Sequence, residues 1–216
     1  MIGIKIHRFA EELWPINRSI TGSGLRKTLR CIQNKLPSLA IHSIQSKSKV
    51  FDWEVPREWK VNSAYIIKPD GHKICDFSSN NLHLLNYSVP FKGDLTLQEL
   101  KPNLYTLPEQ PDAIPYVTSY YQERWGFCMT HSEYVSLPEG SYKVIVDTEL
   151  FDGELNYGEL FIPGKSKKEV LLSTYVCHPS MANNELSGPT VLTYIAKFID
   201  DLPDREYSYR IIFIPE

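Results

Sequence analysis

The chain has 216 residues, of which 42% are apolar and 23% are charged, and its formal net charge is −3. This length and composition allow a sizeable buried core and exclude a disordered chain, and the lack of a basic run argues against nucleic acid or an anionic membrane as partner. The longest apolar stretches fall far short of the ~20 residues that cross a bilayer, and residues 1–5 lack a signal-peptide pattern, so we expect a cytoplasmic protein.

The first fifty residues are typical of two helices followed by a strand. Residues 7–14 predict a short helix that Pro15 closes, and apolar residues recur at helical spacing in the segment that follows Ser23. Thr21 or Ser23 is the expected N-cap of this second helix. The loose alternation of residues 40–50 predicts a strand.

The composition changes between Phe51 and about Glu139, where tryptophan and tyrosine accompany short strands that prolines interrupt. The Pro-Asp-Gly sequence at residues 69–71 predicts a hairpin turn between strands at 64–68 and 73–77. This part of the chain is therefore expected to be rich in β structure.

The change in composition also predicts the domain organisation. We expect an α/β domain formed by residues 1–50 and 141–216, interrupted by a β-rich inserted domain over residues 51–140. The aromatic side chains of the insert are expected to form its core, with stacking on sugars as the alternative.

The last quarter of the chain alternates strands and a helix. The expected elements are strands at 142–146, 157–162, 169–176 and 207–214 and a helix from Ser187, its expected N-cap. A strand, a helix and a further strand in this order predict a parallel βαβ unit of an α/β sheet. Because the chain stops directly after an apolar strand, we expect a C-terminal part of this domain to be missing.

Two polar residues follow neighbouring strands of this predicted unit. His178 comes after the strand at 169–176, and Glu216 comes after the strand at 207–214. The carboxyl ends of parallel strands lie at one edge of a sheet, which is where open α/β sheets bind ligands, and the loop at 182–188 would hang over the same edge. An imidazole, a carboxylate and a polar loop can form a metal and general-base site.

Structural roles remain open for each of these residues. His178 can simply end a strand with its ring hydrogen-bonded to a loop, Glu216 can be solvated, and Asn184 can order its loop through backbone hydrogen bonds. Cys177 beside His178 suggests a thiol nucleophile, but neighbours on an extended chain point to opposite faces, which argues against that pairing. With no CxxC pair among the four cysteines, we expect reduced thiols.

Residues 173–180, the Asn-Asn-Glu-Leu-Ser-Gly loop and the final Ile-Pro-Glu together resemble the zinc-dependent aminopeptidase superfamily. More narrowly, they are similar to aminopeptidase-like proteins associated with bacterial polysaccharide-biosynthesis clusters. The resemblance extends to the segments at 14–22, 50–53, 80–83, 111–116 and 125–128.

The resemblance implies a zinc-exopeptidase-like sheet, of the phosphorylase/hydrolase-like type, with helices on both faces and one or two zinc ions. It gives His178 the position of a metal ligand, Asn184 the position of a bridging ligand and Glu216 that of the general base. Ser180 stands where the superfamily has an aspartate that orients the histidine, and Glu185 is an auxiliary charge. Further ligands would lie beyond the last residue of this chain.

Asn184 departs from the superfamily in a way that weakens metal binding, because a neutral carboxamide replaces an anionic bridging carboxylate. The leading hypothesis is a zinc-dependent aminopeptidase or related amide hydrolase that acts on a peptide or another small amide, and an N-deacylase would use the same chemistry. The alternative is a catalytically inactive binding or scaffolding module linked to polysaccharide biosynthesis. The sequence leaves the oligomeric state open, a homo-oligomer included.

Overall fold

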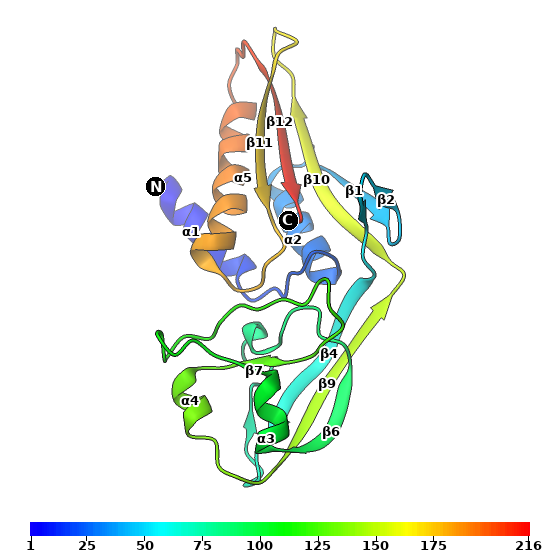
Figure 1. Cartoon of the computed structure of the whole chain (residues 1–216). Coiled ribbons are helices and arrows are strands. Elements are labelled where there is room, and N and C mark those ends of the chain that lie inside the picture. Colours follow the sequence, from blue (N-terminus) through cyan, green and yellow to red (C-terminus); the bar gives the residue numbers. More distant parts are fainter. The chain divides into compact units, whose positions relative to one another are not determined.

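A computed structural model describes residues 1–216, which divide into two compact units (Figure 1). The first unit consists of Met1–Glu58 and Asp152–Glu216, and the second consists of Trp59–Phe151. No helix in the chain combines the length and the apolar character that a membrane span requires.

The first unit is built on a four-stranded sheet with the order β1-β10-β12-β11. Its strands are β1 (Ala40–Gln45), β10 (Glu154–Ile162), β11 (Glu169–Tyr175) and β12 (Ser208–Ile214). β10 runs antiparallel to both β1 and β12, whereas β11 and β12 are parallel neighbours. The parallel pair, joined through a helix, confirms the predicted βαβ unit.

Two helices, α2 (Ser23–Lys35) and α5 (Ser187–Asp200), pack against this sheet, and α1 (Ile2–Leu13) packs on α5. They share one apolar core with inward residues of the strands, such as Leu160 and Ile211. On the opposite face Phe161 and Leu171 lie beside Arg210 and are 46% and 61% exposed, respectively. The expectation of helices on both faces is therefore not met within this chain, because all three amphipathic helices bury their apolar sides in the same core.

Both expected helix caps were wrong. The N-cap of α2 is Gly22, whose φ of 104° lies in the left-handed region that glycine adopts without a Cβ clash, and not Thr21 or Ser23. α5 follows directly from η3 (Ala182–Leu186), a π-helical turn, so Ser187 is already a helical residue and Leu186 is the N-cap. The Ser187 hydroxyl instead donates to the carbonyl of Asn183.

The second unit contains a four-stranded sheet with the order β5-β4-β9-β6. Its strands are β4 (Glu58–Ile67), β5 (Lys73–Ile74), β6 (Phe91–Thr96) and β9 (Ser141–Phe151). β4 and β5 pair antiparallel across the predicted turn, in which Gly71 has a φ of 84°. Trp59 and Tyr87 are buried and stacked, whereas Tyr121 is exposed, so part of the aromatic set lies in the core of this unit.

The unit boundaries lie at 58/59 and 151/152, compared with the expected 50/51 and 140/141. The difference at the second boundary has a structural cause. The strand expected at 142–146 is the centre of β9, which pairs with β6 and so belongs to the sheet of the second unit.

The remaining elements are short. In the first unit β2 (Lys49–Val50) pairs with β3 (Trp53–Glu54). In the second unit, β7 (Leu104–Tyr105) pairs with β8 (Phe127–Cys128), and the short helices are η1 (Asn81–His83), α3 (Leu97–Leu100), η2 (Lys101–Asn103) and α4 (His131–Val135).

Gly24 provides a test of the packing at the start of α2. A Cβ at this position would lie 1.7 Å from the backbone oxygen of Asn17, so Gly24→Ala forces a backbone shift and is expected to lower the free energy of unfolding by about 1–3 kcal/mol. Gly3 in α1 has nothing within 4 Å of its would-be Cβ, so Gly3→Ala should leave stability unchanged or raise it by up to about 1 kcal/mol. Urea unfolding of both variants checks this, and equal effects would contradict the described packing.

Candidate functional site

The carboxyl ends of β11 and β12 bring two polar side chains together. Tyr175 and Ile214 are register partners at the ends of these parallel strands, and the amide of Val176 extends the pairing by donating to the carbonyl of Ile214 at 2.9 Å. Just beyond this point, Nε2 of His178 lies 2.7 Å from Oε2 of Glu216. The structure thus places the imidazole and the carboxylate, which are distant in sequence, in direct contact.

The two partners have different exposure. The imidazole of His178 is buried, with the residue 6% exposed, whereas the side chain of Glu216 is 62% exposed. Burial lowers the pKa of His178 and outweighs the opposing effect of the Glu216 carboxylate. The ring is therefore expected to be neutral at neutral pH, the form that binds metal ions.

Cys177 contacts both members of this pair. Its Sγ lies 3.5 Å from Nδ1 of His178 and accepts a hydrogen bond from the backbone N–H of Glu216 at 3.2 Å. The argument that Cys177 and His178 point to opposite faces was wrong, because β11 ends at Tyr175 and the chain is no longer part of the strand there. Burial raises the pKa of the Cys177 thiol to about 12, so it stays protonated and is no nucleophile.

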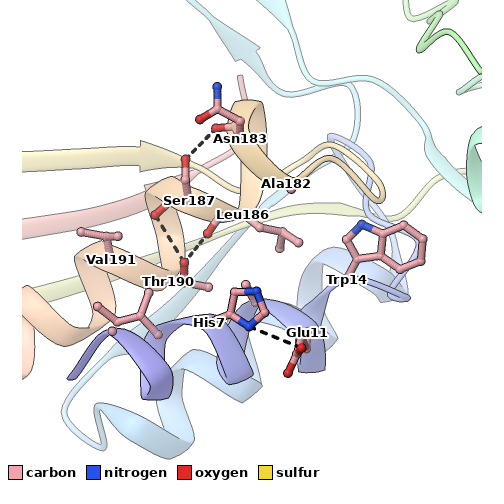
Figure 2. A pocket seen from close by; sticks show the side chains of 12 residues that line it. His7, Glu11, Trp14, Ala182, Asn183, Leu186, Ser187, Thr190 and Val191 are labelled. Atoms are coloured by element: carbon pink, nitrogen blue, oxygen red, sulfur yellow. Dashed lines mark hydrogen bonds and ion pairs between the residues drawn. The ribbon is translucent and has the colours of Figure 1, made fainter. Parts of the chain in front are cut away.

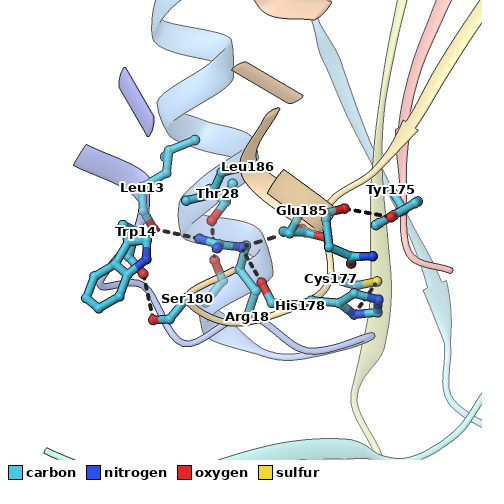
Figure 3. Close-up of polar contacts among 12 residues, drawn as sticks. Leu13, Trp14, Arg18, Thr28, Tyr175, Cys177, His178, Ser180, Glu185 and Leu186 are labelled. Atoms are coloured by element: carbon cyan, nitrogen blue, oxygen red, sulfur yellow. Dashed lines mark hydrogen bonds and ion pairs between the residues drawn. The ribbon is translucent and has the colours of Figure 1, made fainter. Parts of the chain in front are cut away.

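Arg18 is fully buried beneath the site and ties it to the N-terminal segment (Figure 3). Its Nε donates to the backbone carbonyl of His178 at 2.9 Å, and its Nη1 donates to that of Leu13, at the end of α1, at 2.6 Å. Its Nε also lies 3.7 Å from Oε1 of Glu185. Sequence reasoning did not single out Arg18, since nothing in a lone arginine signals that it will be buried.

Glu185 points inward from the π-helical turn η3 and is 1% exposed. Neither of its carboxylate oxygens makes a hydrogen bond of ordinary geometry, but the Arg18 guanidinium and the backbone N–H groups of Cys177 and His178 all act on this carboxylate. Burial raises its pKa to about 8, although the nearby Arg18 guanidinium acts in the opposite direction. A buried carboxylate without a short hydrogen bond is rare in folded proteins; here the raised pKa favours the protonated form, and Arg18 is the cation that faces the ionised form.

The other two residues singled out from the sequence occupy different surroundings. Asn184 is exposed, and its backbone carbonyl accepts a hydrogen bond from the hydroxyl of Tyr175 at 2.6 Å. The Ser180 hydroxyl donates to the carbonyl of Trp14 at 3.0 Å, so it does not orient the imidazole. Of the predicted set, the structure thus gathers His178, Glu216 and Glu185.

These donors fit a single metal ion. Ligand atoms of Cys177, His178 and Glu185 lie within 4.8 Å of one another, and imidazole nitrogen and carboxylate oxygen are ordinary zinc ligands. His178 and Glu185 are the two donors of this group that the sequence also singled out, and the Cys177 thiol becomes a zinc ligand only if the ion deprotonates it. The structure gives no anionic ligand for a second ion at Asn184, the residue expected to bridge, because this side chain is a neutral amide and is exposed.

A separate apolar cavity of about 510 Å³ lies between α1 and the η3-α5 segment (Figure 2). Trp14, Leu186 and Val191 are among its lining residues. It shares the turn η3 with Glu185, but His178 and Glu216 do not line it, so the polar site and the apolar cavity are distinct.

Comparisons with known proteins agree with this architecture. The model of a family described as a domain of unknown function (DUF4910) matches residues 7–216. A Clostridium acetobutylicum protein, provisionally named a polysaccharide biosynthesis protein with aminopeptidase-like domain, is 50% identical over 214 residues, which cover 99% of this chain and 49% of that protein. The chain therefore spans about half the length of this curated relative.

Solved structures give the same picture. A Clostridium acetobutylicum protein provisionally described as a peptidase superimposes with a TM-score of 0.96 at 50% identity, over 99% of this chain and 50% of that one. A zinc aminopeptidase from Bacillus subtilis gives a TM-score of 0.57 at 9% identity, and an M28 peptidase precursor from Shewanella amazonensis gives 0.62 at 12%; 96% of this chain is covered in both, with 60% and 63% of those chains. The last two show likeness of fold alone.

Replacement of Arg18 tests its place in the site. Arg18→Met removes the donor to the carbonyls of His178 and Leu13 and leaves Glu185 without its counter-charge, so we expect a loss of about 3–5 kcal/mol in the free energy of unfolding. Arg8→Met, an exposed position in α1, is the matched control and should change stability by less than about 0.5 kcal/mol. A small effect at Arg18 in denaturant unfolding would contradict this account.

Proposed function

The chain belongs to the DUF4910 domain family, and we propose that it carries the water-activating part of a zinc-dependent amide hydrolase of aminopeptidase type. The observation that carries the proposal is the 2.7 Å contact between Nε2 of His178 and Oε2 of Glu216 at neighbouring strand ends. Likeness of fold to a zinc aminopeptidase supports the choice of metal and reaction class.

The proposed role of each residue follows from its burial. His178 and Glu185 would hold the ion, since the buried imidazole is neutral and no hydrogen bond of ordinary geometry occupies the Glu185 carboxylate. A bound zinc ion lowers the pKa of a coordinated water and polarises the scissile carbonyl. Glu216, whose carboxylate reaches solvent, takes a proton from the attacking water and returns it to the leaving amine. Arg18 holds the backbone of His178 in place.

The substrate class follows from this chemistry together with the aminopeptidase-like relative. We propose an amide with a nearby free amine, as at the N-terminus of a peptide, because carboxylates at the site attract an ammonium group. An N-acylated sugar is a different amide for the same chemistry, and the name of the relative links that protein to polysaccharide biosynthesis. Parallel assays on the two substrate classes separate them.

A second candidate is a binding or scaffolding module without catalysis. Two observations favour it: Asn184, which the resemblance predicts to bridge the metals, carries a neutral amide, and Ser180 bonds to Trp14 instead of orienting the imidazole. Both changes lower the expected metal affinity.

Zinc titration tests the metal site. Calorimetry of the chain is expected to show one zinc per chain, and His178→Gln should weaken this binding at least tenfold because it removes a ligand. His7→Gln replaces an exposed histidine and should leave binding unchanged. Absence of zinc binding, or equal binding by the His178 variant, would exclude His178 as a ligand.

Turnover tests the role of Glu216. In the complete gene product that contains this sequence, Glu216→Gln is expected to lower kcat on aminoacyl p-nitroanilides by a factor of about 10²–10⁴ while zinc is still bound. Zinc binding without turnover by the unmodified protein on peptide or N-acyl sugar substrates would favour the non-catalytic candidate.

A further inference from the structure

Cys177, His178 and Glu216 form a closed ring of polar contacts. Sγ of Cys177 meets Nδ1 of His178 at 3.5 Å, Nε2 of the same imidazole meets Oε2 of Glu216 at 2.7 Å, and the backbone N–H of Glu216 returns to Sγ at 3.2 Å. One buried side chain therefore touches both residues of the proposed reaction.

The direction of each hydrogen bond in this ring follows from the chemistry of the groups. An ionised carboxylate can only accept, so Nε2 of a neutral His178 must carry the ring proton and donate it to Glu216. In the neutral ring Nδ1 is then the acceptor, and the Cys177 thiol, whose sulfur lies 3.5 Å away, is the group placed to donate to it. The sulfur lone pairs remain available for the N–H of Glu216.

We propose that Cys177 is a positioning residue that fixes the tautomer of His178 and the place of Glu216. Its S–H donates to Nδ1 and holds the ring as the Nε2–H form aimed at the carboxylate, while its sulfur anchors the backbone of Glu216. The catalytic use of the aligned His178–Glu216 pair rests on the proposed function. The alignment of the two side chains by Cys177 does not depend on it.

The same side chain suits a second state of the ring. If the ring proton sits on Nδ1 instead, the sulfur can accept a hydrogen bond from Nδ1–H as well as donate to a bare Nδ1. Serine offers the same two capacities, whereas alanine offers neither, which gives a matched pair of variants.

The test uses nitrogen-15 NMR of histidine-labelled, metal-free chain, with His178→Gln to assign the signals. We expect the Nε2–H tautomer of His178 to dominate in the unmodified protein. Cys177→Ala should lower the population ratio of the Nε2–H to the Nδ1–H tautomer by about twofold to fivefold and speed the hydrogen exchange of the Glu216 amide. Cys177→Ser should restore both the tautomer ratio and the exchange rate. Cys128→Ala, which removes a buried cysteine of the second unit, is the control and should change neither.

Each outcome decides the proposal. A dominant Nδ1–H form in the unmodified protein would overturn it, and this spectrum needs no variant to fold. An unchanged tautomer in Cys177→Ala would also overturn it. A thiolate-to-cobalt charge-transfer band in the cobalt(II)-loaded chain would show that Cys177 is a metal ligand, and this would overturn its role as a positioning residue. Failure of zinc binding would refute the proposed function and leave the metal-free NMR result standing.

Discussion

The buried guanidinium of Arg18 is the charge on which the polar site depends. Removing such a group from water costs several kcal/mol, and the structure offsets this with hydrogen bonds to the carbonyls of Leu13 and His178 and with the nearby Glu185 side chain. These partners come from the end of α1, from the segment after β11 and from the turn η3. One side chain therefore connects the N-terminal segment with residues 178–185, which are far away in sequence.

Parallel strand pairing supplies the second constraint. Because β11 and β12 end in register, the residues that follow them emerge at one edge, and His178 meets Glu216 there without any further device. Below this edge lie Cys177 and Glu185, each with little or no contact with water. The site thus has an exposed carboxylate, that of Glu216, a buried neutral imidazole, that of His178, and the buried side chains of Cys177 and Glu185 beside them.

Sequence patterns predicted what depends on local periodicity and on strand order. The βαβ unit and the meeting of His178 with Glu216 followed from apolar strands that end in a polar residue. The inward turn of Glu185 could not be predicted, because it depends on a π-helical turn that replaces an ordinary loop. Nor could the contact of Cys177 with His178, which requires the chain to leave the strand at Tyr175. The single helical layer on the sheet was missed because periodicity shows that a helix has an apolar side and not which sheet face it covers.

The central claim is that His178 and Glu185 together hold one zinc ion beside Glu216. Anomalous diffraction at the zinc absorption edge, from crystals of this chain grown with zinc, tests it most directly. The account predicts one strong peak within bonding distance of the His178 imidazole and the Glu185 carboxylate. A peak at Asn184 with Glu185 still turned toward Arg18, or no peak near His178, would contradict it.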